Sequence, residues 1–360
     1  MNELYKIHRN WRLIFNEDYI ELNAPLLTKS IRIRGIQSEG MLKWFNLAQS
    51  GATLNNLIET LNNTGVTSAE MYIENLCNLG VIYKLENVKE IDGHENNTSN
   101  NDYFSSQICF LEEFEQSGIT GKQYQNNLKN SKVVILGMGG YGSQIAMLLS
   151  RVGVGNIIGI DYDVIEYSNL NRQILYSPDA VGQKKVKYAA KRLKLDSPAT
   201  KFTAVDRKIN TIEDIKEFLN STNLLILPLP ESIDSNNKFI QEIVSILKYC
   251  KLIQCDVAFL SGPFIGPLIP YNSNVCLCNI TGLSSVRQLA TETRRFNQSK
   301  KLGTILPKMM IQTSIFCWEI VRHLTKISQS KIECTILQVD SFDYTISKLD
   351  LDLAQDCQCN

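Results

Sequence analysis

One segment, residues 132–172, constrains the fold of this chain more than any other. Its sequence is KVVILGMGGYGSQIAMLLSRVGVGNIIGIDYDVIEYSNLNR. An apolar run typical of a buried strand leads into a glycine-rich turn, and a pattern typical of a helix follows from Ser143 to Arg151. A phosphate site at a helix N-terminus requires this order of strand, glycine turn and helix.

The glycine turn and the strand that follows it predict a nucleotide site. Gly137 permits the tight turn, Gly139 lets the backbone approach a phosphate, and Gly142 lets the helix pack closely on the strand. The next strand ends in Asp161, whose carboxylate can accept hydrogen bonds from a ribose hydroxyl. The predicted cofactor-binding residues of this region are Gly137, Gly139, Gly140, Gly142, Asp161, Asp163 and Gln173.

Strand and helix patterns alternate along the rest of the chain, and they include a helix predicted over residues 212–219. A long amphipathic helix is predicted over residues 305–325, and two late strands over residues 334–339 and 344–349. This alternation predicts an α/β fold with a doubly wound, Rossmann-like and mostly parallel sheet in residues 103–360.

Residues 1–84 differ in pattern and are predicted to form a small winged helix-turn-helix domain. Their short strand and helix patterns lie at residues 11–15, 19–22, 31–34, 38–50, 53–63, 68–79 and 81–83. The third helix holds two Glu and no Lys or Arg. Because a recognition helix meets phosphates with basic residues, DNA binding is disfavoured. Residues 85–102 are polar and rich in Asn, so we expect a linker there.

The overall charge argues against two classes of partner. Lys plus Arg and Asp plus Glu both number 37, so the formal net charge is zero, which gives no bulk attraction to nucleic acid or to an anionic membrane. The sequence has no signal-peptide pattern and no apolar run near ~18 residues. We therefore expect a soluble, cytoplasmic protein that binds neither nucleic acid nor membrane. The ten cysteines are too sparse for a disulfide scaffold and favour reduced thiols or a metal site.

The glycine turn and Asp161 alone also fit an NAD site. ATP is favoured by the later Asn169 and by two cations, Arg172 and Lys185. Cations near a triphosphate offset the charge that builds on the leaving pyrophosphate. With these residues included, residues 131–350 resemble the E1-like adenylating family (ThiF, MoeB and HesA), and in particular its peptide-modifying branch in microcin C and pantocin biosynthesis. The resemblance is carried by the segments VVILGMGGYGS, IIGIDYDVIEYSNLNRQIL and DAVGQKKV.

The resemblance implies a role for each matching residue. Asp161 would hold the ribose of ATP, Asn169 and Arg172 would contact the phosphates, and Lys185 would lie on the triphosphate; the last three are the predicted catalytic residues. In the family reaction a carboxylate attacks the α-phosphate of ATP and forms an acyl adenylate and pyrophosphate. The family precedent also implies a homodimer. The alternative to an active adenylating site is a Rossmann-like domain that is kept only as a scaffold.

Two features of the ATP site depart from the family pattern. The acidic residue that binds Mg²⁺ in the family corresponds to Pro230, and Glu231 and Asp234 are the candidates to replace it. The family also supplies an Arg from the helix before the first strand, whereas this chain has no Arg between Arg34 and Arg151. An arginine contact is worth several kcal/mol at a phosphoryl transition state, so its loss implies slow chemistry, another cation or none.

A third departure concerns cysteine pairs that bind structural zinc in the family. This chain has two Cys-x-Cys pairs near the corresponding places, each one residue shorter than the family pair: Cys276, Cys278, Cys357 and Cys359. Four thiolates favour a closed Cys₄ zinc site, and reduced thiols are the alternative. No cysteine occurs in residues 282–307, where ubiquitin-type members carry a thioester cysteine. We therefore expect an acyl adenylate to be passed to another nucleophile.

The N-terminal unit resembles the PqqD-like leader-peptide recognition element of enzymes that modify ribosomally made peptides. The matching segments are IRIRG at residues 31–35, LIETL at residues 57–61 and LCNLGVI at residues 76–82. In that family the peptide adds as a further strand beside the wing and lies against the third helix, which is β-augmentation. The resemblance implies the peptide-binding residues Ile31, Arg32, Ile33, Arg34, Tyr72 and Asn75. A plain packing or dimerisation module is the alternative.

These expectations combine into one predicted function. A precursor peptide is bound through its leader, and the α/β domain uses ATP, with Mg²⁺, to adenylate one of its carboxyl groups during bacteriocin or related peptide biosynthesis. The alternative is a non-catalytic partner that presents the leader to a separate cyclodehydratase. A sulfur-carrier activator is a third possibility, but such an enzyme needs no N-terminal module.

Overall fold

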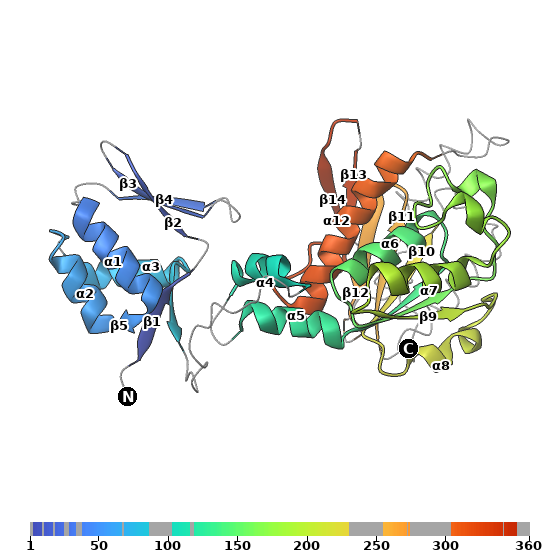
Figure 1. The fold of residues 1–360 in the computed structure, drawn as a ribbon. Helices are drawn as coiled ribbons and strands as arrows, with labels where there is room; N and C mark the ends of the chain where they lie inside the picture. Colours follow the sequence, from blue (N-terminus) through green and yellow to red (C-terminus); the bar gives the residue numbers. More distant parts are fainter. Residues whose placement is uncertain are drawn as a thin grey trace. The chain divides into compact units, whose positions relative to one another are not determined.

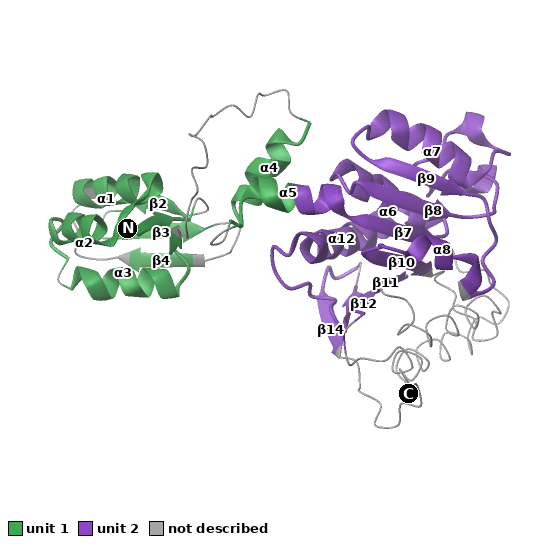
Figure 2. Ribbon diagram, turned by 90° about the horizontal axis from the view of Figure 1, so that it is seen from below, with its two compact units in different colours: residues 1–125 green, residues 126–360 purple. Residues whose placement is uncertain are grey.

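The structure is a computed structural model. It describes residues 3–8, 11–16, 19–24, 29–33, 38–66, 68–85, 103–115, 119–229, 255–271, 273, 304–340 and 342–350. The chain divides into two compact units, residues 1–125 and 126–360 (Figure 2). Most of the linker predicted for residues 85–102 lies outside the described residues, so the predicted domain limits at 84 and 103 stay a prediction.

An eight-stranded sheet forms the centre of the second unit (Figure 1), in the order β14-β13-β12-β11-β10-β7-β8-β9. Its five parallel strands are β11 (Asp256–Ser261), β10 (Leu224–Leu229), β7 (Lys132–Leu136), β8 (Asn156–Ile160) and β9 (Lys201–Val205). Its antiparallel end consists of β12 (Phe264–Ile269), β13 (Thr335–Val339) and β14 (Ile346–Asp350). The predicted mostly parallel α/β sheet is confirmed.

The central strand β7 is buried on both faces. Val133 and Ile135 belong to one apolar cluster, and Val134 and Leu136 belong to another. Such a strand is expected where helices cover both sides of a parallel sheet. The first cluster includes side chains of α6 (Gly140–Arg151), α7 (Lys185–Asp196) and α12 (Leu306–Thr325). These three helices lie side by side on one face of the sheet (Figures 1 and 2).

The helix predicted over residues 212–219 is shorter than expected. The structure has a 3-10 turn at Ile212–Asp214 and the four-residue helix α8 (Lys216–Leu219). The Asp214 carboxylate accepts hydrogen bonds from the backbone N–H groups of Asn210 and Thr211, at 2.8 Å each. A short acidic side chain that binds nearby backbone in this way favours a turn over a continuous helix.

Three helices of the first unit lie where the sequence predicts them. They are α1 (Ser38–Ser50), α2 (Leu54–Asn62) and α3 (Ala69–Asn78). The Thr53 side chain caps α2 by accepting from the Asn56 N–H at 3.3 Å. Their apolar faces meet in a core that contains the fully buried Trp11 and Trp44.

The strands of the first unit form two separate sheets. One has β2 (Arg12–Phe15), β3 (Ile20–Ala24) and β4 (Lys29–Ile33) in that order, and the other has the order β5-β1-β6. The second sheet contains β1 (Leu4–Ile7), which the sequence pattern did not predict, between β5 (Ala52–Thr53) and β6 (Ile82–Leu85). The strand that returns after the third helix therefore pairs with the start of the chain and not with the β2–β4 sheet.

Among the described residues, no helix is both long enough and apolar enough to cross a membrane.

Candidate functional site

The glycine turn between β7 and α6 is held in one conformation by contacts of its own backbone. Gly137 has a φ of +94°, and its N–H donates to the Ile160 carbonyl at 2.7 Å. A Cβ at Gly142 would lie 1.8 Å from the Gly137 oxygen, so only glycine fits where α6 meets the turn. A Cβ at Gly139 would meet no atom within 4 Å. The turn is therefore tightly packed at Gly142 and has free space at Gly139, where a phosphate needs access to the backbone.

Asp161 connects the end of β8 to this turn. Its Oδ2 accepts from the Met138 N–H and its Oδ1 accepts from the Asp163 N–H, both at 2.7 Å. The Tyr176 hydroxyl donates to the Met138 carbonyl at 2.6 Å. Burial, and then the nearby Asp161 carboxylate, raises the pKa of Tyr176 well above its ordinary value, so the phenol stays a donor. The N–H and the carbonyl of Met138 are therefore both held by hydrogen bonds, to Asp161 and to Tyr176.

The loop after β8 places Lys185 beside the same edge of the sheet. Its Nζ lies 2.8 Å from Oδ2 of Asp163, and its backbone N–H donates to the Asp163 carbonyl at 3.1 Å. The Lys185 side chain is 8% exposed and stands in the first turn of α7. An ammonium group and the N-terminus of a helix, both positive, therefore lie together at the carboxyl ends of the parallel strands.

Other predicted site residues hold this loop together. Asn169 is buried, and its Oδ1 accepts from the Glu166 N–H at 3.2 Å in a capping box. The Arg172 guanidinium donates to the Ser168 carbonyl at 2.7 Å, while its own carbonyl accepts from Gln144 of α6 at 3.1 Å. Buried Gln173 has an Oε1 with no hydrogen-bond partner in the part of the chain that the structure describes.

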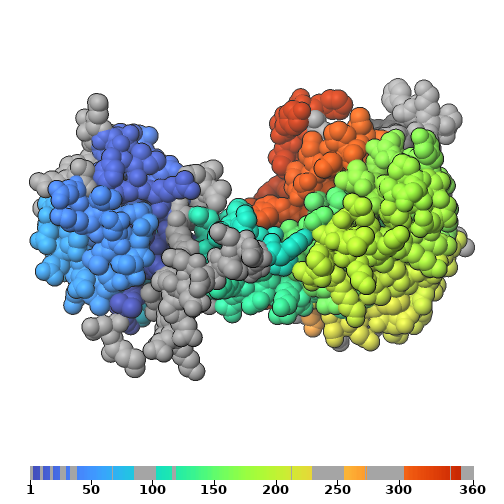
Figure 3. All heavy atoms as spheres, viewed as in Figure 1, coloured from blue at the N-terminus to red at the C-terminus, as the bar shows by residue number. Residues whose placement is uncertain are grey.

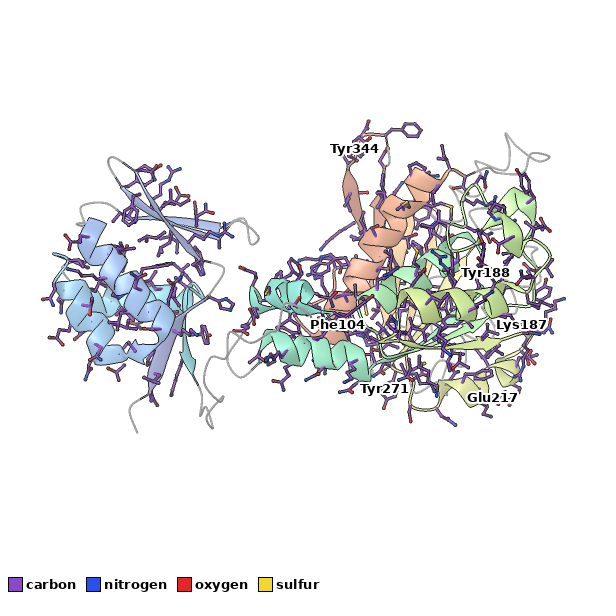
Figure 4. All side chains as sticks on the ribbon, viewed as in Figure 1. Phe104, Lys187, Tyr188, Glu217, Tyr271 and Tyr344 are labelled. Carbon is purple, nitrogen blue, oxygen red and sulfur yellow. The ribbon has the colours of Figure 1, made fainter. Side chains whose placement is uncertain are left out.

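Two aromatic residues of this region were not predicted from the sequence. Tyr188 on α7, labelled in Figure 4, contacts the Tyr176 ring edge to face, with ring centroids 6.1 Å apart. Neighbouring Lys187 is 69% exposed and lies 4.0 Å from the Asp206 carboxylate. Tyr176 gives no sequence signal because it lies 38 residues from the Met138 carbonyl that it binds.

The predicted metal ligands cannot be placed. Glu231, Asp234 and the four paired cysteines Cys276, Cys278, Cys357 and Cys359 lie outside the described residues. Within the described ranges, no three His, Cys, Asp or Glu side chains are grouped closely enough to hold a metal ion. The Mg²⁺ and zinc sites stay predictions.

The two helices that precede β7 are joined by a glutamine pair. Gln107 of α4 (Ser105–Glu112) donates from Nε2 to Oε1 of Gln125 on α5 (Gly121–Asn130), at 2.5 Å. No Lys or Arg occurs in residues 103–121. α4 therefore carries no basic side chain, whereas α5 carries Lys122 and Lys129.

The predicted peptide-binding residues lie on β4 and α3 of the first unit. β4 is an edge strand of its sheet. Ile31 is half-buried, and Arg32 lies 3.5 Å from the Glu21 carboxylate and stacks over the Tyr19 ring at 5.0 Å. Ile33 pairs with Ile20 of β3.

The two predicted residues on α3 differ in exposure. Tyr72 is half-buried, and burial raises its pKa, whereas Asn75 is exposed. Arg34 lies outside the described residues.

The chain is similar to known proteins in sequence and in fold. The family model described as "ThiF family" matches residues 104–360. The ubiquitin-like modifier-activating enzyme 5 of Culex quinquefasciatus is 38% identical over 100 residues, which are 28% of this chain and 25% of that protein. The same enzyme of Aedes aegypti is 38% identical over 94 residues, or 26% of this chain and 23% of that protein. The matched segment thus spans only about a quarter of these relatives.

Solved structures match nearly the whole chain in fold. The crystal structure of E. coli MccB with ATP covers 99% of this chain and 100% of its own, with a TM-score of 0.73 and 20% identity. The microcin C7 biosynthetic enzyme MccB in complex with N-formylated MccA has the same coverage and TM-score at 19% identity. PaaA covers 95% of this chain and 98% of its own, with a TM-score of 0.66 and 18% identity. From the match over residues 104–360 and the site that those residues form, we conclude that this chain belongs to the ThiF family.

Proposed function

We propose that this protein uses ATP to adenylate a carboxyl group of a ribosomally made precursor peptide during peptide natural product biosynthesis. The observation that carries the proposal is the edge of the sheet where the N-terminus of α6, Asp161 and the Lys185–Asp163 pair meet. Membership of the ThiF family supports adenylation. The fold shared with MccB, which was solved with ATP and with MccA, supports a peptide as the substrate.

In the proposed mechanism the chain's own groups bind and orient ATP. The backbone N–H groups at Gly139 and Gly140 face the phosphates, and Asp161 accepts from the ribose hydroxyls. A carboxylate oxygen of the peptide attacks the α-phosphorus of ATP. The bond from that phosphorus to the bridging oxygen of the β-phosphate breaks, and pyrophosphate leaves with the electron pair. Lys185 and Arg172 stabilise the negative charge that develops on the phosphates.

The proposed metal ions have separate roles. Mg²⁺ on Glu231 or Asp234 would neutralise phosphate charge, and zinc on the four paired cysteines would link two distant parts of the chain. No step of the proposed mechanism depends on either ion.

The first unit is proposed to bind the leader of the peptide. An edge strand has unpaired backbone groups, so an extended leader can add beside β4. Tyr72 offers an aromatic surface on α3, and Asn75 offers an exposed amide. The resemblance to a PqqD-like element and the fold match over 99% of the chain support this assignment.

A homodimer is proposed from the same family precedent. Sedimentation velocity on the full chain tests it: a dimer that persists at micromolar concentration supports the proposal, and a monomer under these conditions contradicts it.

Peptide-dependent exchange of labelled pyrophosphate into ATP tests the enzymatic proposal. We expect exchange with the cognate precursor peptide, and we expect Lys185→Ala and Asp161→Ala each to abolish it while the peptide still binds. The Lys194→Ala variant, in the last turn of α7, is the matched control and should exchange like the wild type. Tight peptide binding without exchange in the wild type would support the non-catalytic partner instead.

A further inference from the structure

Helix α12 runs parallel to α6 and begins beside the glycine turn. A Cβ at Gly140 would lie 2.4 Å from Cε of Met309, which stands in the first turns of α12. At the other end of α12, the Thr325 carbonyl accepts from Asn127 at 3.2 Å, and Asn127 lies just before β7. The N-terminus of α12 is therefore at the same edge of the sheet as the N-terminus of α6, where the phosphates are proposed to bind.

Three helix N-termini consequently point to one edge. In Figures 1 and 2, α6 lies between α7 and α12, and contacts join it to both helices. In the space-filling view, the surface of α12, in orange, adjoins that of the segment after residue 160, in yellow-green (Figure 3). The first turn of α7 carries Lys185, and the first turn of α12 carries Lys308. The N-terminus of α6 thus lies between helices that each carry a lysine in the first turn.

A second observation at this place is a buried donor on α12. Gln312 stands one turn after Lys308 on the same face of α12. Its Oε1 accepts from the hydroxyl of Tyr141, the second residue of α6, at 2.7 Å. Its Nε2 is fully buried and has no hydrogen-bond partner among the described residues. A buried donor without a partner costs about 1–3 kcal/mol, so a polar ligand or water at this junction would stabilise the protein.

The charge requirement of the reaction points to the same junction. Lys185 and Arg172 bring two positive charges, and the Asp163 carboxylate offsets part of the Lys185 charge, so a further cation would help to balance a triphosphate even beside the proposed Mg²⁺. The Arg that the family supplies from the helix before the first strand has no counterpart here, because the sequence has no Arg between Arg34 and Arg151. Lys308 is half-buried in the first turn of a 20-residue helix whose dipole also favours anions, and the next residue, Met309, lies against Gly140 of the glycine turn.

We propose that Lys308 binds the β- and γ-phosphates of ATP from the α12 side of the glycine turn, opposite Lys185, and stabilises the leaving pyrophosphate. The assignment rests on the proposed function for its catalytic role, whereas the binding of a triphosphate can be measured without a peptide.

Equilibrium binding of ATP and of AMP separates a contact to the outer phosphates from a structural role. Lys308→Gln should weaken ATP binding roughly tenfold or more, because a hydrogen bond between charged groups is lost, and should change AMP binding by less than about twofold. Lys308→Arg keeps the charge and should restore most of the ATP affinity. Lys194→Gln, at the far end of α7, is the control and should bind both nucleotides like the wild type.

Three outcomes would overturn the assignment, and a fourth would overturn the proposed function instead. Equal losses for ATP and AMP in Lys308→Gln would mean that Lys308 only supports the local fold. Wild-type ATP binding together with a raised KM for the peptide would place Lys308 on the peptide carboxylate. If wild-type exchange is intact and Lys308→Gln has no effect, this assignment fails and the proposed function stands. If the wild type shows no exchange but Lys308→Gln still loses ATP and not AMP, the proposed function fails and the phosphate contact stands.

Discussion

The nucleotide site proposed on the second unit and the peptide surface proposed on the first are built in opposite ways. At the glycine turn, the backbone around Met138 is fixed by Ile160, Asp161 and Tyr176 before any ligand is present. β4, by contrast, is an edge strand whose outer side a ligand strand can complete. A site for an invariant small molecule can be preorganised in this way. A site that accepts an extended peptide gains affinity from backbone pairing and selectivity from a few side chains.

The largest effect is expected from Gly142→Ala, which disrupts the preorganised glycine turn. In Gly142→Ala the new Cβ would lie 1.8 Å from the Gly137 oxygen, so α6 must shift, at a cost of about 3 kcal/mol or more. We expect a lower Tm and no measurable ATP binding.

Gly139→Ala is the matched control, because its Cβ meets no atom of the protein within 4 Å. This variant should keep the wild-type Tm and still lose ATP affinity, since the methyl group occupies the space where the phosphates approach. Wild-type ATP affinity in Gly139→Ala would contradict the placement of the phosphates at this turn.

Asp161→Asn tests the bonds that hold the turn. Asparagine keeps one acceptor, whereas Asp161 accepts from two backbone N–H groups, so one donor loses its partner at about 1–3 kcal/mol. We expect ATP affinity to fall by roughly 100-fold, since the ribose contact is also weakened, as measured by calorimetry. Asp206→Asn is the control, because Asp206 follows the next strand, β9, and pairs with Lys184 at 3.0 Å. A similar loss in both variants would mean that Asp161 has no special role.

Tyr72→Ala tests the peptide-binding surface that is proposed on the first unit. We expect the KM for the precursor peptide to rise roughly tenfold, because an aromatic contact at an interface is worth more than about 1 kcal/mol, while ATP affinity stays unchanged. Glu59→Ala, on the exposed side of α2, should leave both quantities unchanged. A loss of ATP affinity in Tyr72→Ala would contradict the separation of the two sites.

The smallest effect at neutral pH concerns the stability of the first unit. Burial lowers the pKa of His8 from 6.5 to about 4. Below pH 6.5 the unfolded chain takes up a proton at His8 that the folded unit refuses, so stability is complete above pH 6.5 and falls by about 3 kcal/mol as the pH approaches 4.

Unfolding can be followed by the fluorescence of the buried Trp11 and Trp44 in a Trp318→Phe background. His8→Leu should remove this part of the pH dependence. An unchanged pH profile in His8→Leu would contradict the assignment to His8.

The sequence patterns predicted local elements well and distant contacts poorly. The glycine turn, with β7, α6 and β8, follows from short-range periodicity and glycine spacing, as do the three helices of the first unit. β1 was not predicted because its four residues, LYKI, become a strand only through pairing with β6, about 80 residues away. Ser68 precedes α3 and is of a residue type that favours helix N-caps, but it has a φ of +71° and makes no side-chain capping bond. The contacts of Tyr176 with Met138 and of Gln312 with Tyr141 join residues 38 and 171 positions apart, so no local pattern could reveal them.

Transfer of oxygen-18 from the peptide carboxyl group tests the central claim most directly. The precursor peptide is labelled with oxygen-18 in its carboxyl groups and incubated with the wild-type protein, ATP and the acceptor nucleophile, and the products are analysed by mass spectrometry. An acyl adenylate predicts one labelled oxygen in AMP and none in pyrophosphate, because the attacking oxygen stays on the α-phosphorus. Label in inorganic phosphate, or in no phosphorus-containing product while ATP is consumed, would contradict adenylation.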